Sequence, residues 1–279
     1  MTTSKETRIG FIGGGNMARS LVGGLLQSGH TAAAIRISDP SPEALARLSE
    51  LGDVEVGDDN GQVVATSDLL VLAVKPQAMR AVLEPLAPSL AQHRPLLVSI
   101  AAGLTTTALR HWAGALPLVR CMPNTPALVG AGMSVLYATA DVDELGRERA
   151  ETVLNTAGAV RWVEDEDLLD AVTAVSGSGP AYFFHLMEAM IAAGVGQGLD
   201  STTSRELVLQ TALGAARMAL DSGVDPGKLR EQVTSPGGTT AAALAVFTEG
   251  DLLGLTDRAV AAAAARSVAL ARELEQNDD

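Results

Sequence analysis

Two glycine-rich segments of this chain have residue types that bind phosphates and small anions. The first, Gly13-Gly14-Gly15-Asn16-Met17-Ala18, follows the apolar run Ile9–Ile12 and precedes an amphipathic stretch. Its spacing, Gly13-x-Gly15-x-x-Ala18, is the dinucleotide fingerprint in its alanine-ended form. Gly13 permits a sharp turn, Gly15 lets the backbone approach a pyrophosphate, and Ala18 allows close packing of helix on strand. The pattern predicts a nucleotide site, and the alternative is an ordinary glycine turn.

The second segment, Ser235-Pro236-Gly237-Gly238-Thr239-Thr240, stands at the start of a predicted helix. Free N–H groups at the positive end of a helix dipole bind small anions, and the two threonine hydroxyls can donate or accept hydrogen bonds. A similar run, Ser176–Tyr182, also precedes a predicted helix, with Ser178 as its cap and Pro180 in its first turn. Each motif alone is also explained as a capped helix start, but two of them together favour ligand binding.

General bases are scarce in the second half of the chain. Residues 165–279 contain one lysine, Lys228, and one histidine, His185. Lys228 lies beside a Pro-Gly turn and is expected in solvent, whereas the apolar neighbours of His185 predict a packed core histidine. No catalytic triad and no cluster with metal-ligand spacing is visible, so no metal is expected. An alcohol dehydrogenase needs a general acid or base for the hydroxyl proton, whereas a protonated imine is already electrophilic, so the pattern favours a C=N substrate.

The elements that position these segments fall into two classes. Up to about residue 160, short apolar runs alternate with helical patterns, which predicts βαβ units on a parallel sheet. The expected strands are Ile9–Ile12, Ile35–Ser38, Leu69–Val74, Leu96–Ile100 and Leu118–Cys121, with Met133–Tyr137 as a further candidate and one more helix and strand within 134–163.

Beyond residue 165 the strand signal ends. The expected helices are Leu168–Val175, Pro180–Val195, Ser201–Ser222, Pro226–Val233, Thr239–Glu249 and Leu255–Glu275, with helix-start signals at Asp200 and Asp225. We therefore expect an α/β fold. Residues 1–164 form a Rossmann-type doubly wound parallel sheet, and residues 165–279 form an all-helical domain.

Ligands bind at the carboxyl ends of strands in such a sheet, and three strand ends stand out. Asp39 follows the second strand, where an acid binds the adenosine ribose and disfavours the 2′-phosphate of NADP. Ordinary turn and capping chemistry explains Asp39 equally well. Lys75, one of three lysines, ends the third strand and is expected to place the cofactor. The small residues of Ser99–Gly103 leave room for a flat ring, although tight packing alone also explains them.

Composition narrows the function classes. The formal net charge of −13 argues against nucleic acid and anionic membrane as partners. A single cysteine, Cys121, excludes an intrachain disulfide. The first eight residues are polar and no apolar run approaches membrane-spanning length, so we expect a cytoplasmic protein.

The chain resembles the pyrroline-5-carboxylate reductase family over residues 8–273. The two most specific matches are Asp170–Thr173 with Ser176–Tyr182, and Ser235–Thr240. The others are Gly10–Met17, Ala73–Pro76, Ser99–Gly103 and Met122–Pro126. The resemblance implies hydride transfer from NADPH or NADH to the imine of 1-pyrroline-5-carboxylate, giving L-proline in the last step of proline biosynthesis.

The resemblance also assigns site residues. Together with Asp39, the expected cofactor residues are Ile12, Gly13, Gly14, Gly15, Asn16, Met17, Asn60, Ala73, Val74, Lys75, Pro76, Ile100, Ala101 and Ala102. The expected substrate residues are Glu166, Ser235, Gly237, Gly238, Thr239 and Thr240, with the Thr240 hydroxyl as the catalytic group at the ring nitrogen. Family members often have a neutral residue where this chain has Asp39, which leaves the choice between NADPH and NADH open.

The resemblance further implies a homodimer with interlocked helical domains, in which each active site uses both chains. Whether dimers assemble into a larger ring stays open. One alternative is a hydroxyacid dehydrogenase of the same layout, which would require a well-placed lysine or histidine in the helical domain. Another is a nucleotide-sensing protein with a degenerate site, against which the intact Ser235–Thr240 segment argues.

Overall fold

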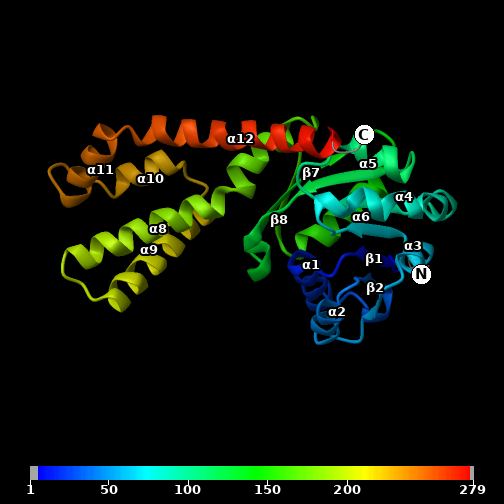
Figure 1. The fold of residues 1–279 in the computed structure, drawn as a ribbon. Helices are drawn as coiled ribbons and strands as arrows, with labels where there is room; N and C mark the ends of the chain where they lie inside the picture. The colour runs from blue at the N-terminus through cyan, green and yellow to red at the C-terminus, as the bar shows by residue number, and fades with distance from the viewer. Residues whose placement is uncertain (1–5, 277–279) are drawn as a thin grey trace. The chain divides into compact units, whose positions relative to one another are not determined.

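A computed structural model describes residues 6–276, so most of the polar segment 1–8 lies outside the described residues. The chain divides into two compact units (Figure 1). The first holds the residues up to Ser178 together with those from Ala263 onward, and the second holds Gly179–Ala262. No helix within residues 6–276 is long and apolar enough to cross a membrane.

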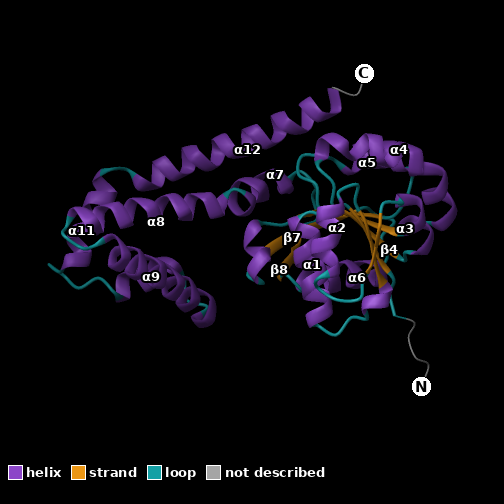
Figure 2. Ribbon diagram, turned by 60° about the horizontal axis from the view of Figure 1, so that its bottom comes forward, coloured by secondary structure: helices purple, strands orange, loops and turns teal. Residues whose placement is uncertain are grey.

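An eight-stranded sheet forms the centre of the first unit (Figure 2). The strands are β1 (Ile9–Ile12), β2 (Ile35–Ser38), β3 (Glu55–Gly57), β4 (Leu69–Leu72), β5 (Leu96–Ser99), β6 (Leu118–Met122), β7 (Gly132–Ala138) and β8 (Gly158–Trp162). They lie in the order β3-β2-β1-β4-β5-β6-β7-β8, and every pair is parallel except β6–β7. The doubly wound sheet is confirmed, with an antiparallel pair and a short strand β3 that the sequence did not indicate.

Both faces of this sheet are covered by helices. Along β1, Ile9 and Phe11 belong to one core cluster and Ile12 to the other, because successive side chains point to opposite faces. The helices are α1 (Asn16–Gln27), α2 (Pro42–Ser49) and α6 (Glu144–Asn155) on one face, and α3 (Asn60–Thr66), α4 (Pro76–His93) and α5 (Thr106–Ala113) on the other. Burial on both faces explains why these strands are continuous apolar runs.

The elements that follow β8 are all helical. They are α7 (Leu168–Val172), a π turn at Thr173–Gly177, α8 (Gly179–Gly196), α9 (Ser201–Ser222), α10 (Pro226–Gln232), α11 (Thr239–Glu249) and α12 (Leu252–Gln276). The helix starts predicted at Asp200 and Asp225 are confirmed, since each side chain accepts backbone N–H bonds of its helix. The hydroxyl and N–H of Thr203 lower the pKa of Asp200.

The helix cap predicted at Ser178 is wrong. Ser178 has helical backbone angles, and its N–H donates to the Thr173 carbonyl over 2.8 Å. The chain thus stays helical from α7 through the π turn into α8. A π turn shifts the hydrogen-bond pattern, so Pro180 can follow it without being preceded by a cap.

The boundaries of the two compact units differ from the domain boundary predicted between residues 164 and 165. Segments 165–178 and 263–276 pack with the sheet unit; for example, the Glu166 carboxylate accepts from the Thr106 N–H over 2.7 Å, and Leu274 of α12 lies beside Gly103. Compactness and function can divide a chain differently, and the functional boundary at 164/165 stays a prediction.

Candidate functional site

The glycine turn after β1 has the geometry that the fingerprint predicts. Gly13 has φ +100°, and a Cβ there would lie 2.7 Å from the carbonyl carbon and oxygen of Ala73. Its N–H donates to the Ser38 carbonyl over 2.8 Å, which ties the turn to the end of β2. Position 13 therefore accepts only glycine, because a side chain would be strained and would overlap the backbone beyond β4.

The start of α1 is open. Gly15 is its N-terminal cap residue, and no side chain caps the helix. A Cβ at Gly15 would meet nothing within 4 Å. The first N–H groups of α1 thus have no side-chain cap, and they carry the positive end of the helix dipole. This arrangement fits the pyrophosphate of a dinucleotide cofactor.

Asp39 supports the glycine turn from the end of β2. Its carboxylate accepts from the Gly14 N–H over 2.7 Å and from the Ser41 N–H over 2.8 Å. The cap of α2 is Ser41, whose hydroxyl accepts from the Ala44 N–H. Asp39 is half-buried and stabilises its own turn through Ser41. Through Gly14 it also contacts the glycine turn that is predicted to hold the cofactor. Its two interpretations are therefore compatible.

The other predicted cofactor residues gather at the same edge of the sheet, because they follow parallel strands. Asn60 begins α3 and accepts from the Ser38 hydroxyl over 2.6 Å. The N–H of Ile100 donates to the carbonyl of Leu72, at the end of β4. Lys75 is exposed before α4, and its ammonium group has no partner among the described residues. A free cation at this edge can attract a phosphate.

A pocket of about 360 Å³ opens beside this edge, within the first unit. Pro76 and Ala102, two predicted cofactor residues, line it together with apolar residues such as Leu270 and Leu274 of α12. Leu274 also lies 3.3 Å from where a Cβ of Gly103 would be, at φ +76°. The sequence did not indicate α12 as a neighbour of the cofactor edge, since no motif marks that contact.

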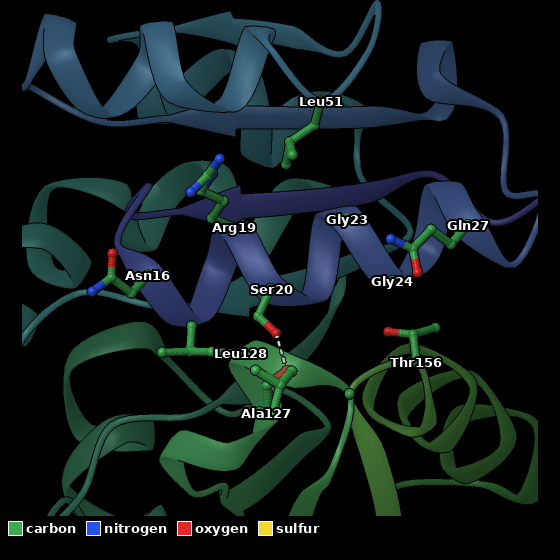
Figure 3. A pocket seen from close by; sticks show the side chains of 12 residues that line it. Asn16, Arg19, Ser20, Gly23, Gly24, Gln27, Leu51, Ala127, Leu128 and Thr156 are labelled. Carbon is green, nitrogen blue, oxygen red and sulfur yellow. Dashed lines mark hydrogen bonds between the residues drawn. The ribbon is translucent and has the colours of Figure 1, made fainter. Parts of the chain in front are cut away.

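A larger pocket, of about 490 Å³, runs along α1 (Figure 3). Asn16, Arg19 and Gln27 line one side and Leu128 the other, where the Ser20 hydroxyl donates to the Ala127 carbonyl over 2.5 Å. Asn16 is the one predicted cofactor residue in its lining. This pocket is thus a flank of the helix rather than the predicted pyrophosphate position.

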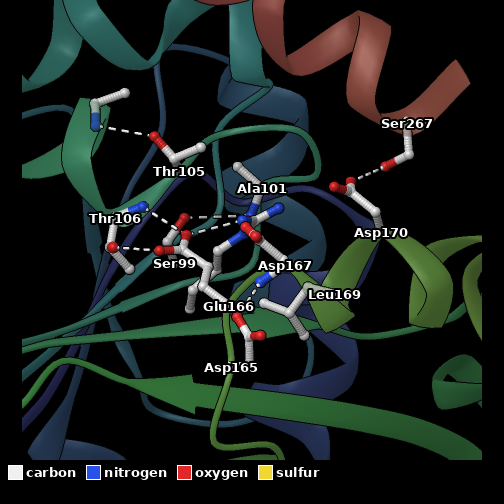
Figure 4. A network of polar contacts seen from close by, with 12 residues as sticks. Ser99, Ala101, Thr105, Thr106, Asp165, Glu166, Asp167, Leu169, Asp170 and Ser267 are labelled. Atoms are coloured by element: carbon white, nitrogen blue, oxygen red, sulfur yellow. Dashed lines mark hydrogen bonds and ion pairs between the residues drawn. The ribbon is translucent and has the colours of Figure 1, made fainter. Parts of the chain in front are cut away.

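Glu166 lies in a polar network of the first unit (Figure 4). Its carboxylate accepts from the N–H and the hydroxyl of Thr106, at 2.7 and 2.5 Å, and from Arg120 Nη1 at 2.8 Å. The exposed fraction is 8% for the Arg120 side chain and 18% for that of Glu166. Both carboxylate oxygens are therefore already engaged by protein donors.

The predicted substrate segment belongs to the second unit. Gly237 has φ +71°, and the Gly238 N–H donates to the Ser235 carbonyl over 3.0 Å, which closes a tight turn. The helix α11 then begins at Thr239 without a side-chain cap. The Thr240 hydroxyl has no partner among the described residues. Uncapped N–H groups beside a free hydroxyl can bind a carboxylate and a neighbouring polar atom.

Other titratable groups are not arranged for catalysis. The predicted burial of His185 is wrong: 86% of its side chain is exposed, beside Glu188, because no other segment of residues 6–276 covers that side of α8. Burial raises the pKa of the Cys121 thiol to about 12, so it is no nucleophile. Across residues 6–276 no group of three or more His, Cys, Asp or Glu could hold a metal ion.

Comparison with known proteins agrees with the assignment of both segments, the glycine turn and the helical region. A family model described as pyrroline-5-carboxylate reductase dimerisation matches residues 166–270, and one described as NADP oxidoreductase coenzyme F420-dependent matches residues 8–103. A pyrroline-5-carboxylate reductase of Pseudomonas aeruginosa is 52% identical over 96% of this chain and 98% of its own length.

Solved structures agree as well. A pyrroline-5-carboxylate reductase from Coxiella burnetii is 41% identical with a TM-score of 0.92, covering 95% of this chain and 99% of the other. The Plasmodium falciparum enzyme, solved with NADP bound, is 30% identical with a TM-score of 0.82, covering 95% and 98%. From this similarity along nearly the whole length, the chain belongs to the pyrroline-5-carboxylate reductase family.

Proposed function

We propose that this protein is an NAD(P)H-dependent oxidoreductase that reduces the imine of 1-pyrroline-5-carboxylate to L-proline, the last step of proline biosynthesis. The observation that carries the proposal is the near full-length family match in a chain that keeps both open helix starts, at Gly15 and at Gly238. No observation favours the hydroxyacid dehydrogenase alternative, because among residues 165–276 His185 pairs with Glu188 of its own helix and Lys228 lies beside a Pro-Gly turn.

The first unit holds the cofactor. The α1 N–H groups bind the pyrophosphate beside Gly15, and Asn60 and Asp39 lie at the adenosine end. The turns after β4 and β5 carry the rest of the proposed cofactor set, including Lys75 and Ile100–Ala102. When bound, the nicotinamide supplies the hydride.

The segment Ser235–Thr240 holds the substrate. Its helix N–H groups bind the carboxylate, which needs no lysine in this acidic chain. Thr240 is the proposed catalytic residue, because its free hydroxyl can hydrogen-bond the ring nitrogen as that atom gains electrons. Holding the carboxylate fixes the imine carbon, and such positioning supplies much of the catalysis in a transfer reaction.

The choice of cofactor depends on Asp39. A carboxylate at the end of β2 accepts bonds from ribose hydroxyls and repels a 2′-phosphate. Because Asp39 also holds the glycine turn, its charge is fixed beside the nucleotide. The protein uses NADPH or NADH, and we propose that Asp39 shifts the balance toward NADH.

The protein acts as a homodimer. The second unit leaves large apolar side chains uncovered, among them Phe183 at 65%, Phe184 at 62% and Leu253 at 85% exposure. Such a surface is typical of a protein interface. The dimerisation model covers this region, which agrees with a second copy as partner. We also propose a cytoplasmic location, which the single cysteine supports. Rings of dimers follow from the resemblance alone, and light scattering decides the assembly.

One assay tests the proposed function. NADH and NADPH oxidation is followed separately at 340 nm, with and without pyrroline-5-carboxylate, and proline is measured as product. We expect substrate-dependent oxidation and equal amounts of proline formed and cofactor consumed. Cofactor binding without turnover would support the nucleotide-sensing alternative and overturn the proposal.

A further inference from the structure

Glu166 joins three elements that are distant in sequence. It lies between β8 and α7, and its carboxylate binds Thr106 of α5 and Arg120 of β6 (Figure 4). Its backbone carbonyl also accepts from the Leu169 N–H at the start of α7. One acidic side chain thus links the first turn of a helix to a buried strand and to the segment that leads out of the sheet.

These contacts lie at both ends of one turn. Arg120 is paired with Ser99, the last residue of β5, in the parallel register of the sheet. Thr106 is the first residue of α5. The turn between them, residues 100–105, contains the small residues proposed to line the nicotinamide path. Glu166 therefore binds next to the point where this turn leaves the strand and at the point where it enters the helix.

The first turn of α5 needs an acceptor that its own cap does not supply. Thr105 caps the helix by accepting from the Ala108 N–H, which leaves the Thr106 N–H for another partner. Glu166 accepts it, and its negative charge lies at the positive end of the helix dipole. The carboxylate also neutralises Arg120, a cation that is 7% exposed.

We propose that Glu166 is a positioning residue for hydride transfer: it fixes the turn 100–105 against the nicotinamide ring and does not touch the substrate. The proposal rests on the proposed function for the identity of the ring. Protein donors take three of the roughly four acceptor positions of the Glu166 carboxylate, so most of its hydrogen-bonding capacity serves the structure.

The test separates the nicotinamide end of the cofactor from the rest. ADP-ribose contains the adenosine and pyrophosphate but lacks the nicotinamide, so it reports only on the glycine turn. We compare the Kd of NADH with that of ADP-ribose by fluorescence and calorimetric titration in Thr106→Val and Glu166→Gln. If the protein selects NADPH, then NADPH and 2′-phospho-ADP-ribose are titrated in place of NADH and ADP-ribose.

Matched controls keep the fold in view. Thr107→Val makes the same change at the next residue, which is exposed. Thr106→Ser keeps the hydroxyl that donates a hydrogen bond to Glu166. The melting temperature of every variant is measured, and all titrations are run well below it. Where Glu166→Gln leaves Arg120 unpaired and fails to fold, Thr106→Val decides the question alone.

We expect Thr106→Val and Glu166→Gln to lower kcat and to raise the ratio of the NADH Kd to the ADP-ribose Kd, by about threefold to tenfold, the range for one lost polar contact. The ADP-ribose Kd and the substrate KM should stay within about twofold of the wild-type values. Thr107→Val and Thr106→Ser should behave as the wild type does.

Two results would overturn the proposal. An increase confined to the substrate KM in Glu166→Gln, with Thr106→Val unchanged, would make Glu166 a substrate ligand. A lower melting temperature with an unchanged Kd ratio and kcat would make the network purely structural. The titrations need no pyrroline-5-carboxylate, so they decide this inference even if the reductase assay fails.

Discussion

Replacing Asp39 by serine should change both cofactor choice and stability, and the two effects can be separated. The Asp39 carboxylate accepts two backbone N–H bonds, from Gly14 and Ser41. Bonds to a charged group are worth about 1.5–3 kcal/mol each, and water around this half-buried side chain reduces the loss to about 2 kcal/mol in total. We therefore expect a melting temperature lower by roughly 4–8 °C.

The effect on cofactor choice comes from charge alone. Repulsion between the Asp39 carboxylate and a 2′-phosphate near the surface is on the order of 1 kcal/mol, which is about fivefold in affinity. Asp39→Ser should thus improve NADPH relative to NADH by about fivefold to tenfold. The assay is titration of both reduced cofactors by fluorescence, together with kcat/KM for each.

The control is Asp58→Ser, which removes the same charge from an exposed residue just beyond β3. It should alter neither the cofactor ratio nor the melting temperature. If Asp39→Ser melts earlier while its NADPH to NADH ratio stays as in the wild type, Asp39 only supports the turn. The electrostatic reasoning would then be refuted.

Gly15→Val should abolish NAD(P)H binding because its side chain would occupy the place of the pyrophosphate, and the fold should survive because no protein atom lies there. Equal cofactor affinity in the wild type and Gly15→Val would contradict the proposed pyrophosphate site. Gly13→Ala should instead destabilise the protein, because its side chain would overlap Ala73. Thr240→Val should lower kcat/KM by roughly 10- to 1000-fold with little change in cofactor affinity, and Thr240→Ala should be about as impaired. Near wild-type turnover in Thr240→Val would limit that segment to carboxylate binding by its backbone. Cys121 should resist iodoacetamide at pH 8 in the native protein, since its pKa is about 12. Because the unfolded thiol ionises near its ordinary pKa of 9.0 and the buried one does not, stability should fall as pH rises from 9 to 12, and less so in Cys121→Ala.

The sequence by itself determined those features that depend on neighbours along the chain. The Gly13–Ala18 turn, the caps at Asp200 and Asp225, and the bounds of α9 and α11 all follow from backbone freedom, capping and hydrophobic period. Such signals lie within a few residues of the structure they specify. The order of strand and helix, and hence the doubly wound sheet, could be predicted for the same reason.

Only the tertiary structure decided which distant groups meet. Glu166 binds Thr106 and Arg120, which lie 60 and 46 residues away, and no local pattern records that pairing. The lining of the cofactor edge by Leu274 and the exposure of His185 were equally hidden, because both depend on how whole helices are covered. A residue's type limits what chemistry it can do, but its long-range contacts determine whether it is free to do it, and those contacts form only when the chain folds.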